Sequence, residues 1–288
     1  MIRQLITYGL YPMLLAATIG FVAYTIHYDW DLKTAFVWFA GARFAVLLTC
    51  EFLFPAKVQW KMTLRSFWRD IKYGIMTMAV SRGLRFVIIL LSIDIAAQNP
   101  NGPLTGSGIL TGFLLTALTA EFLQYWFHRY CHEGKGKAGR FFWRIHAAHH
   151  LPDKVYLIMH GVMHPLNQII SFALIQFALI SLGASAESIF MVNALMGFHG
   201  LISHFNVDIR AGWLNYIFIS TELHRYHHSA NITESKNYGG FLTIWDLVFG
   251  TFYYRRNHLP DRLGVVDPEI YPESNNMIKV LSLPFRRD

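Results

Sequence analysis

The sequence predicts an all-α integral membrane protein with four spans, a helical hairpin and a histidine-rich cytoplasmic cap. Three observations support this fold class. Of the 288 residues, 53% are hydrophobic and 15% are charged, and the mean hydropathy of +0.31 is high for a soluble domain. The apolar residues form stretches long enough to cross a hydrocarbon core of roughly 30 Å. All histidines except His27 fall at or near one expected membrane face.

The expected elements follow from the lengths of the apolar stretches. Four stretches are long enough to be spans, and a tighter pair is typical of an in-and-out hairpin that turns near "SLGAS". We expect the spans at residues 5–26, 33–54, 73–97 and 108–127, and the hairpin helices at 165–183 and 185–204.

Lysine and arginine set the expected orientation. The 55–72 loop carries five of them, whereas the turns at 28–32 and 98–105 carry none. Because short basic loops stay in the cytoplasm, we place both termini, the 128–164 loop and the chain after about residue 205 on the cytoplasmic side. The protein is thus expected to be a multi-pass protein of the bacterial inner membrane or the endoplasmic reticulum. The net charge of +7 fits this topology and contact with anionic lipid, and no nucleic-acid-binding platform is evident.

Ten histidines occur in four spaced groups, HxxxH, HxxHH, HxxxxH and HxxHH. At about 100° per residue, each HxxHH group puts three imidazoles on one helical face. The five-residue spacing of the third group makes its two rings diverge by about 140°, so a π-bulge or a helix end is needed to bring them together; we favour His204 over His199. The ten residues are His128, His132, His146, His149, His150, His199, His204, His224, His227 and His228.

This grouping predicts a metal site, because packing or interface preference gives no reason for it. A zinc site takes four ligands, so ten imidazoles fit two metals with four or five nitrogen ligands each. Imidazole suits zinc, copper, iron and nickel, which leaves the metal open. The lack of thiolates and carboxylates argues against an iron–sulfur cluster or a carboxylate-bridged pair. We interpret His27 and His258 as interface residues, and the sequence leaves open whether His160 and His164 contribute.

Five segments that contain or adjoin these histidines resemble a known family, the fatty acid hydroxylase/sterol desaturase superfamily of integral membrane di-iron enzymes. They are "EFLQYWFHRYCH", "WRIHAAHH", "HGLISHFNVDIRAGWLNYIF", "TELHRYHHS" and "NYGGFLTIWDLVFGTFY". The resemblance implies that the ten histidines bind two iron ions, with His199 as the tenth ligand, and zinc can replace iron in purified protein. It also implies a lipid substrate, O₂, and electrons from an external ferredoxin- or cytochrome-type donor. Residues 1–120 would form membrane spans. Residues 121–288, which include the hairpin at 165–204 and the cytoplasmic cap, would form the catalytic region, and both parts would belong to one domain.

Two residues besides the histidines are expected to serve catalysis, Glu121 and Asn206. Glu121 lies seven residues before His128, about 20° away on the helix and inside the membrane, where an ionisable residue is a functional candidate. A carboxylate there can tune neutral imidazole ligands; the alternative is a packing role against a neighbouring span. Asn206, Glu222 and Asp246 are weaker candidates for the same tuning role. Where the family often has aspartate, this chain has Glu121.

Two classes of function remain open. The first is a di-iron oxygenase acting on a membrane lipid, with hydroxylation favoured over desaturation or oxidative ether cleavage. The second is a membrane metal transporter or metal-binding protein, which would place its ligands near the bilayer midplane on broken helices, whereas these groups gather at one face. The sequence leaves open the lipid, which could be a sterol, a sphingoid base, an alkylglycerol, an ornithine lipid or a fatty acyl chain. The position of attack, the donor and the oligomeric state also stay open.

Overall fold

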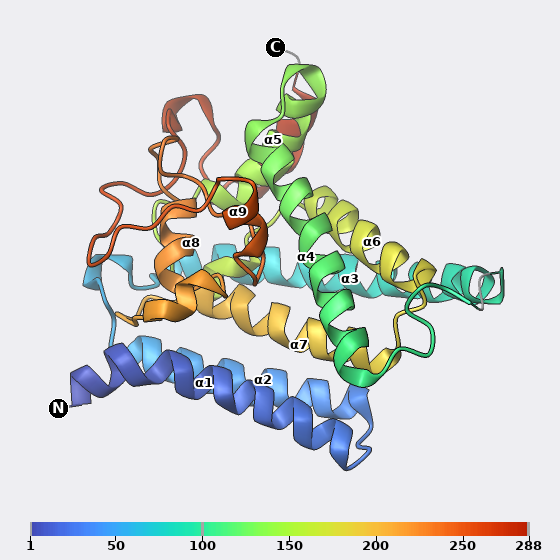
Figure 1. Cartoon of the computed structure of the whole chain (residues 1–288). Helices are drawn as coiled ribbons and strands as arrows, with labels where there is room; N and C mark the ends of the chain where they lie inside the picture. Colours follow the sequence, from blue (N-terminus) through green and yellow to red (C-terminus); the bar gives the residue numbers. More distant parts are fainter. Residues whose placement is uncertain (1, 99–100, 287–288) are drawn as a thin grey trace.

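The computed structural model describes residues 2–98 and 101–286, and its regular elements are helical (Figure 1). The described ranges contain isolated β-bridges and no strand, so the all-α prediction is confirmed for them. The α-helices are α1 (Ile2–His27), α2 (Leu32–Leu53), α3 (Leu64–Gln98), α4 (Ile109–Glu133), α5 (Gly136–His150), α6 (Pro165–Ser181), α7 (Ala186–Ser203), α8 (Thr221–His227), α9 (Ile244–Val248) and α10 (Met277–Ser282). Short 3₁₀ helices are η1 (Val58–Trp60), η2 (Leu157–Gly161), η3 (Gly212–Tyr216), η4 (Pro268–Ile270) and η5 (Leu283–Phe285).

Two helices in the described part of the chain, α1 and α2, are long and apolar enough to cross a membrane. Their outward faces expose large apolar side chains, among them Met13, Trp38 and Phe52. Helices α3 and α4 cover the third and fourth expected spans but do not pass the same test of length and composition. The expected count of four spans therefore stays a prediction. The expected turn at 98–105 includes residues 99 and 100, which lie outside the described ranges.

Two segments expected as loops are partly helical. Helix α3 begins at Leu64, so the second half of the basic 55–72 loop belongs to it. Its start is a reciprocal cap, in which the Thr63 N–H donates to Ser66 Oγ and the Ser66 N–H donates to Thr63 Oγ1. Hydropathy does not detect such a cap. The expected 128–164 loop contains α5. The turn between α4 and α5 brings Gly139 against the Gly134 backbone, a close approach that is possible because Gly139 has no side chain.

Helix α7 is the centre of the fold. It packs against α1, α2, α4, α8 and η2, and Figure 1 shows it between the α1–α2 pair and the rest of the bundle. The largest apolar cluster joins Tyr11 of α1, Leu47 of α2, Ala120 of α4, and Phe198 and Ile202 of α7. The α6–α7 turn occurs in the expected "SLGAS" segment, where Gly183 has a φ of 75° that suits glycine.

The connections divide between two ends of the bundle. The α1–α2 turn meets the starts of α4 and α7 around one pocket, lined by Thr25, Trp30, Ile109 and Glu187 among others. At the opposite end, the α2–α3 connection pairs with the segment that follows α7, through the Ala56 N–H donating to the Asn206 carbonyl. The N-terminus and α8 also lie toward this second end (Figure 1). The fold therefore gathers the segments after residue 205 at the end where the basic loop begins.

Candidate metal centre

Nine of the ten expected histidines converge in two adjacent groups. In each group the candidate ligand atoms lie within 4.8 Å of one another. The first group is His128, His132, His146, His150 and His227, and the second is His149, His204, His224 and His228. All nine are buried except His132, which is partly buried.

Each HxxHH motif contributes to both groups. In α5, His146 and His150 enter the first group and His149 enters the second. At the end of α8 the division is reversed, because its i, i+4 pair enters the second group and His227 enters the first. Helical geometry allows this division, since i+4 lies about 40° from i in one direction around the axis and i+3 about 60° in the other, so the i+3 ring leans toward a different neighbour while all three share one face. The motif therefore places imidazoles in two neighbouring sites at once.

The rings are held by hydrogen bonds from the nitrogen that faces away from the groups. In five of the nine, Nδ1 lies at hydrogen-bond distance from an oxygen. These pairs are His128 with the Tyr238 carbonyl (2.8 Å), His146 with Asn167 Oδ1 (3.2 Å), His149 with the Val162 carbonyl (3.0 Å), His204 with the Gly200 carbonyl (2.9 Å) and His227 with the Lys236 carbonyl (3.0 Å). An Nδ1–H that donates to oxygen leaves Nε2 without a proton and free to bind metal.

The inward nitrogens fit a cation. Nε2 of His146 lies 3.0 Å from Nε2 of both His128 and His150, and Nε2 of His204 lies 2.9 Å from Nε2 of His149. Unprotonated nitrogens at this distance repel one another unless a positive charge lies between them. Within the described part of the chain, Nε2 of His132 and of His227 are buried without a hydrogen-bond partner, which costs about 1–3 kcal/mol per group.

Burial keeps these imidazoles neutral, which is the form that binds metal. Loss of hydration lowers the pKa of His149 to about 3. The same effect, reinforced by repulsion between neighbouring rings, lowers the pKa of His227 and His228 well below the ordinary value. A metal ion entering at neutral pH therefore does not have to displace protons from these rings.

Glu121 contacts the backbone beside the histidine groups, and no hydrogen bond joins it to a histidine among the described residues. Its carboxylate accepts hydrogen bonds from the backbone N–H groups of Gly240 and Phe241. Asp246 accepts in the same way from Tyr238 and Gly239, each at 2.8 Å. Together the two carboxylates hold the turn that presents the Tyr238 carbonyl to the first group. Glu121 is thus connected to His128 through this turn and the Tyr238 carbonyl. The expected catalytic role of Glu121 stays a prediction.

Asn206 ties two segments together and does not contact either group. Its side chain accepts from the Lys57 N–H (3.1 Å) and donates to the Lys57 carbonyl (3.0 Å). Its own N–H donates to Glu51, a buried carboxylate in α2 that also accepts from the Leu157 N–H, each at 2.8 Å. Sequence reasoning missed Glu51, although the signal that identified Glu121, an acid inside an apolar stretch, applies to it equally.

Glu222 also has a structural position. Its carboxylate accepts from the Ala211 N–H (2.9 Å), from Asn215 Nδ2 (3.0 Å) and from the Tyr254 hydroxyl (2.9 Å). These bonds connect α8 with the segment before it and with the segment that carries Tyr254. Glu222 therefore fixes the helix that carries the last HxxHH motif, without touching the imidazoles that face the groups.

His199, expected as the tenth ligand, lies outside both groups. Its Nδ1 is 2.9 Å from the Leu195 carbonyl and its Nε2 is 3.2 Å from the Tyr11 hydroxyl. The ring stacks on Phe218 at 5.1 Å between centroids. His199 sits inside α7 while His204 is its C-cap, so the five-residue spacing sends the two rings in different directions. The structure does not bring His199 to the other nine.

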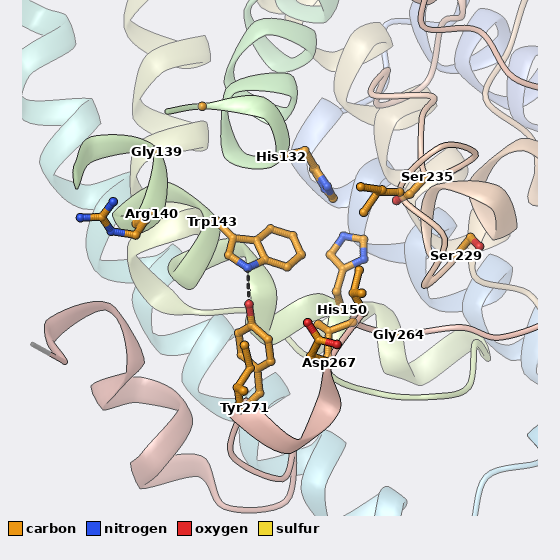
Figure 2. Close-up of a pocket in the computed structure, with 15 residues that line it drawn as sticks. His132, Gly139, Arg140, Trp143, His150, Ser229, Ser235, Gly264, Asp267 and Tyr271 are labelled. Carbon is orange, nitrogen blue, oxygen red and sulfur yellow. Dashed lines mark hydrogen bonds between the residues drawn. The ribbon is translucent and has the colours of Figure 1, made fainter. Parts of the chain in front are cut away.

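A pocket reaches the first group from the side of the C-terminal segments (Figure 2). It has a volume of about 330 Å³ and is lined by residues from the end of α4, from α5 and from the loops near 229–235 and 264–271. His132 and His150 face it, and the Trp143 indole N–H donates to the Tyr271 hydroxyl at 2.7 Å (Figure 2). The pocket gives small molecules a path to the first group that does not pass between α1 and α2.

Comparisons with known proteins agree with this geometry. The family model described as fatty acid hydroxylase matches residues 113–251, a range that contains all nine converging histidines. The chain is 29% identical to the ornithine lipid hydroxylase OlsE of Rhizobium tropici over 96% of this chain and 83% of that protein. It is 28% identical to the alkylglycerol monooxygenase of Caenorhabditis elegans over 80% of this chain and 44% of that protein. It is also 27% identical to the very-long-chain aldehyde decarbonylase GL1-5 of Oryza sativa subsp. indica over 51% of this chain and 24% of that protein.

The chain thus spans less than half of the length of the last two relatives. No solved structure matches it.

The division into two groups predicts the metal content of single variants. Purified protein should hold about two metal ions per chain, one for each group. His228→Ala should lower this by about one ion, because it removes one of the four closely spaced histidines of the second group. His199→Ala should leave the content unchanged, since that ring bonds to Tyr11 instead. Elemental analysis of the three proteins by mass spectrometry measures this. Equal loss in His199→Ala and His228→Ala would contradict the assignment of ligands.

Proposed function

Because the chain belongs to the fatty acid hydroxylase/sterol desaturase superfamily, we propose that it is a membrane-bound di-iron oxygenase that hydroxylates a lipid. The observation that carries this proposal is the convergence of nine histidines in two adjacent groups. The activities of two relatives, an ornithine lipid hydroxylase and an alkylglycerol monooxygenase, support the oxygenase class.

Iron fits the donor set and the reaction. Neither group contains a thiolate or a carboxylate, and imidazole is a good ligand for ferrous iron. Two ferrous ions, when bound, supply the electrons that activate O₂ for attack on an unactivated C–H bond. Zinc binds imidazole at least as well and cannot do this chemistry, so zinc taken up during overexpression should give inactive protein.

The chain's own residues hold the ligands and restrict water. The backbone carbonyls of Tyr238 and Val162 fix the orientation of His128 and His149 and make their Nε2 atoms more basic. The four rings of the second group are buried, which limits side reactions of an activated site with water. The pocket beside His132 and His150 leaves the first group accessible to small molecules.

We propose that the substrate is a membrane lipid that enters from the bilayer. The large apolar side chains exposed on α1 and α2 are those of a surface in contact with hydrocarbon. Among candidate lipids, an ornithine lipid is the first to test, because the ornithine lipid hydroxylase aligns with nearly the whole chain. Ether cleavage and desaturation are the alternatives. The similarity to the alkylglycerol monooxygenase makes ether cleavage the second candidate.

Electrons are proposed to come from a ferredoxin- or cytochrome-type carrier. Hydroxylation inserts one oxygen atom of O₂ into the C–H bond and releases the other as water, which consumes two electrons and two protons. Lys135, Lys137 and Arg140 are exposed at the start of α5, beside the pocket that reaches the first group. A basic surface of this kind attracts an acidic carrier and speeds its association.

A metal transporter is less well supported. Transporters place ion ligands near the bilayer midplane on interrupted helices. Here the histidines come from the C-terminal ends of α4, α5 and α7 and from α8, and their rings pack together at one end of the bundle. That arrangement suits a fixed catalytic centre better than a set of ion sites spread across the bundle.

We also propose that the histidine groups face the cytoplasm. Two matched variants test this in a Cys50→Ala background, in which the remaining Cys131 is buried. Lys33→Cys, exposed after the α1–α2 turn, should react with a membrane-impermeant maleimide added to intact cells. Lys61→Cys, exposed in the basic loop, should react only after permeabilisation. Labelling in the reverse order would place the histidines on the opposite side.

The proposed reaction has a direct isotopic test. Iron-loaded protein supplied with ¹⁸O₂, ornithine lipid and a chemically reduced ferredoxin should give a hydroxylated lipid that carries ¹⁸O, detected by mass spectrometry. Zinc-loaded protein should give none. An unlabelled product short of two hydrogens would indicate desaturation, and an aldehyde released from an alkylglycerol would indicate ether cleavage. Equal product from the zinc-loaded and iron-loaded proteins would refute the di-iron proposal.

A further inference from the structure

The two histidine groups are unequal, and one further histidine lies beside the smaller group. The first group has five members and the second has four. The ring of His160 lies 4.9 Å from the ring of His204 and 6.4 Å from that of His149, measured between centroids. Within the second group itself, ring centroids are 4.4 to 6.4 Å apart. His160 therefore lies at the spacing that separates the members of the group.

The His160 imidazole lacks the hydrogen bond expected of a ring held in place for packing alone. Its Nδ1 is buried and has no partner among the described residues. His164, later in the same segment, differs: its Nδ1 accepts from the Leu166 N–H at 3.1 Å and its Nε2 is 3.2 Å from the Leu281 carbonyl. A buried polar nitrogen without a partner is uncommon and calls for an unseen ligand or ion. The rings of His204 and His149, which lie 4.9 and 6.4 Å from it between centroids, belong to the second group.

A missing side chain makes room for this ring. A Cβ atom at Gly200 would lie 3.0 Å from His160 Cε1 and 3.2 Å from its Nε2. Gly200 lies one helical turn before His204, and its carbonyl accepts the hydrogen bond from His204 Nδ1. Because Gly200 has no side chain, the His160 ring can pack directly against the turn of α7 that carries His204. The space next to that ligand is thus filled by an imidazole from another segment.

The segment that carries His160 is fixed at both ends. At its start, the Leu157 N–H donates to the buried Glu51 carboxylate. At its end, the Val162 carbonyl accepts from His149 Nδ1, a member of the second group. The 3₁₀ helix η2 (Leu157–Gly161) therefore cannot shift far without disturbing that ligand. Such a tether suits a residue that has to meet a metal site.

We infer that His160 is the fifth imidazole ligand of the second group, so that each metal has five nitrogen ligands from the chain. This inference rests on the proposed two-metal centre. The ring nitrogens of His160 lie outside the closely spaced set of four, so the side chain turns toward His204 when metal binds. No hydrogen bond at Nδ1 opposes this rotation.

Cobalt(II) provides a test that does not depend on oxygenase activity, because its visible absorption reports coordination number. With two cobalt ions bound per chain, His160→Ala should strengthen the d–d bands of one ion as it changes from five to four protein ligands. The affinity of that ion should fall by at least about tenfold. His164→Asn, which keeps the acceptor at the start of α6, is the matched control and should leave both ions unchanged.

A second pair of variants reaches the same ring without removing it. Gly200→Ala should displace the His160 ring and change the spectrum in the same direction. Gly41→Ala, where a Cβ meets nothing within 4 Å, should match the wild type. If His160→Ala and Gly200→Ala both keep the wild-type spectrum and affinity at both ions, His160 only packs beside the centre, and the two-metal centre itself still stands. If wild-type protein binds a single cobalt ion, both the two-metal centre and the inference are wrong.

Discussion

The structure depends on one electrostatic constraint, the burial of nine neutral imidazoles whose inward nitrogens converge. At separations near 3 Å these lone pairs repel one another, and buried nitrogens without partners add to the cost. Cations between the rings remove both penalties. For five of the nine rings the surrounding protein places an oxygen beside the outward nitrogen, which sets the protonation of those rings as well as their direction. The described residues therefore form two histidine groups that could each hold a metal ion.

Buried carboxylates stabilise the backbone segments that position the histidine rings. Glu121 and Asp246 stabilise the turn that presents the Tyr238 carbonyl, and Glu51 joins η2 to the segment after His204. Because both HxxHH motifs supply histidines to both groups, a shift of α5 or α8 disturbs the two groups together. We expect metal binding to the two groups to be coupled for this reason.

The sequence predicted the parts of the centre that depend on local geometry. The i, i+3, i+4 spacing predicted that the three rings of each HxxHH motif lie on one helical face, and the number of histidines indicated two metals. It could not predict which ring enters which group, because that depends on how α4, α5 and α8 pack. His199 is an example: Tyr11 of α1 and Phe218, which follows η3, contact its ring. Phe218 is 19 residues away in sequence and Tyr11 is much farther, so only the packing of their segments against α7 reveals these contacts. The start of α3 was missed because a hydroxyl cap, not hydropathy, determines it.

X-ray absorption at the iron edge of iron-loaded protein tests whether the histidines bind the metal, because it reports the atoms around the metal without reference to activity. We expect a first shell of nitrogen or oxygen at about 2.1 Å, with the outer-shell scattering of four or five imidazoles per iron and no sulfur. A sulfur shell, or scattering from only one or two imidazoles per iron, would contradict it.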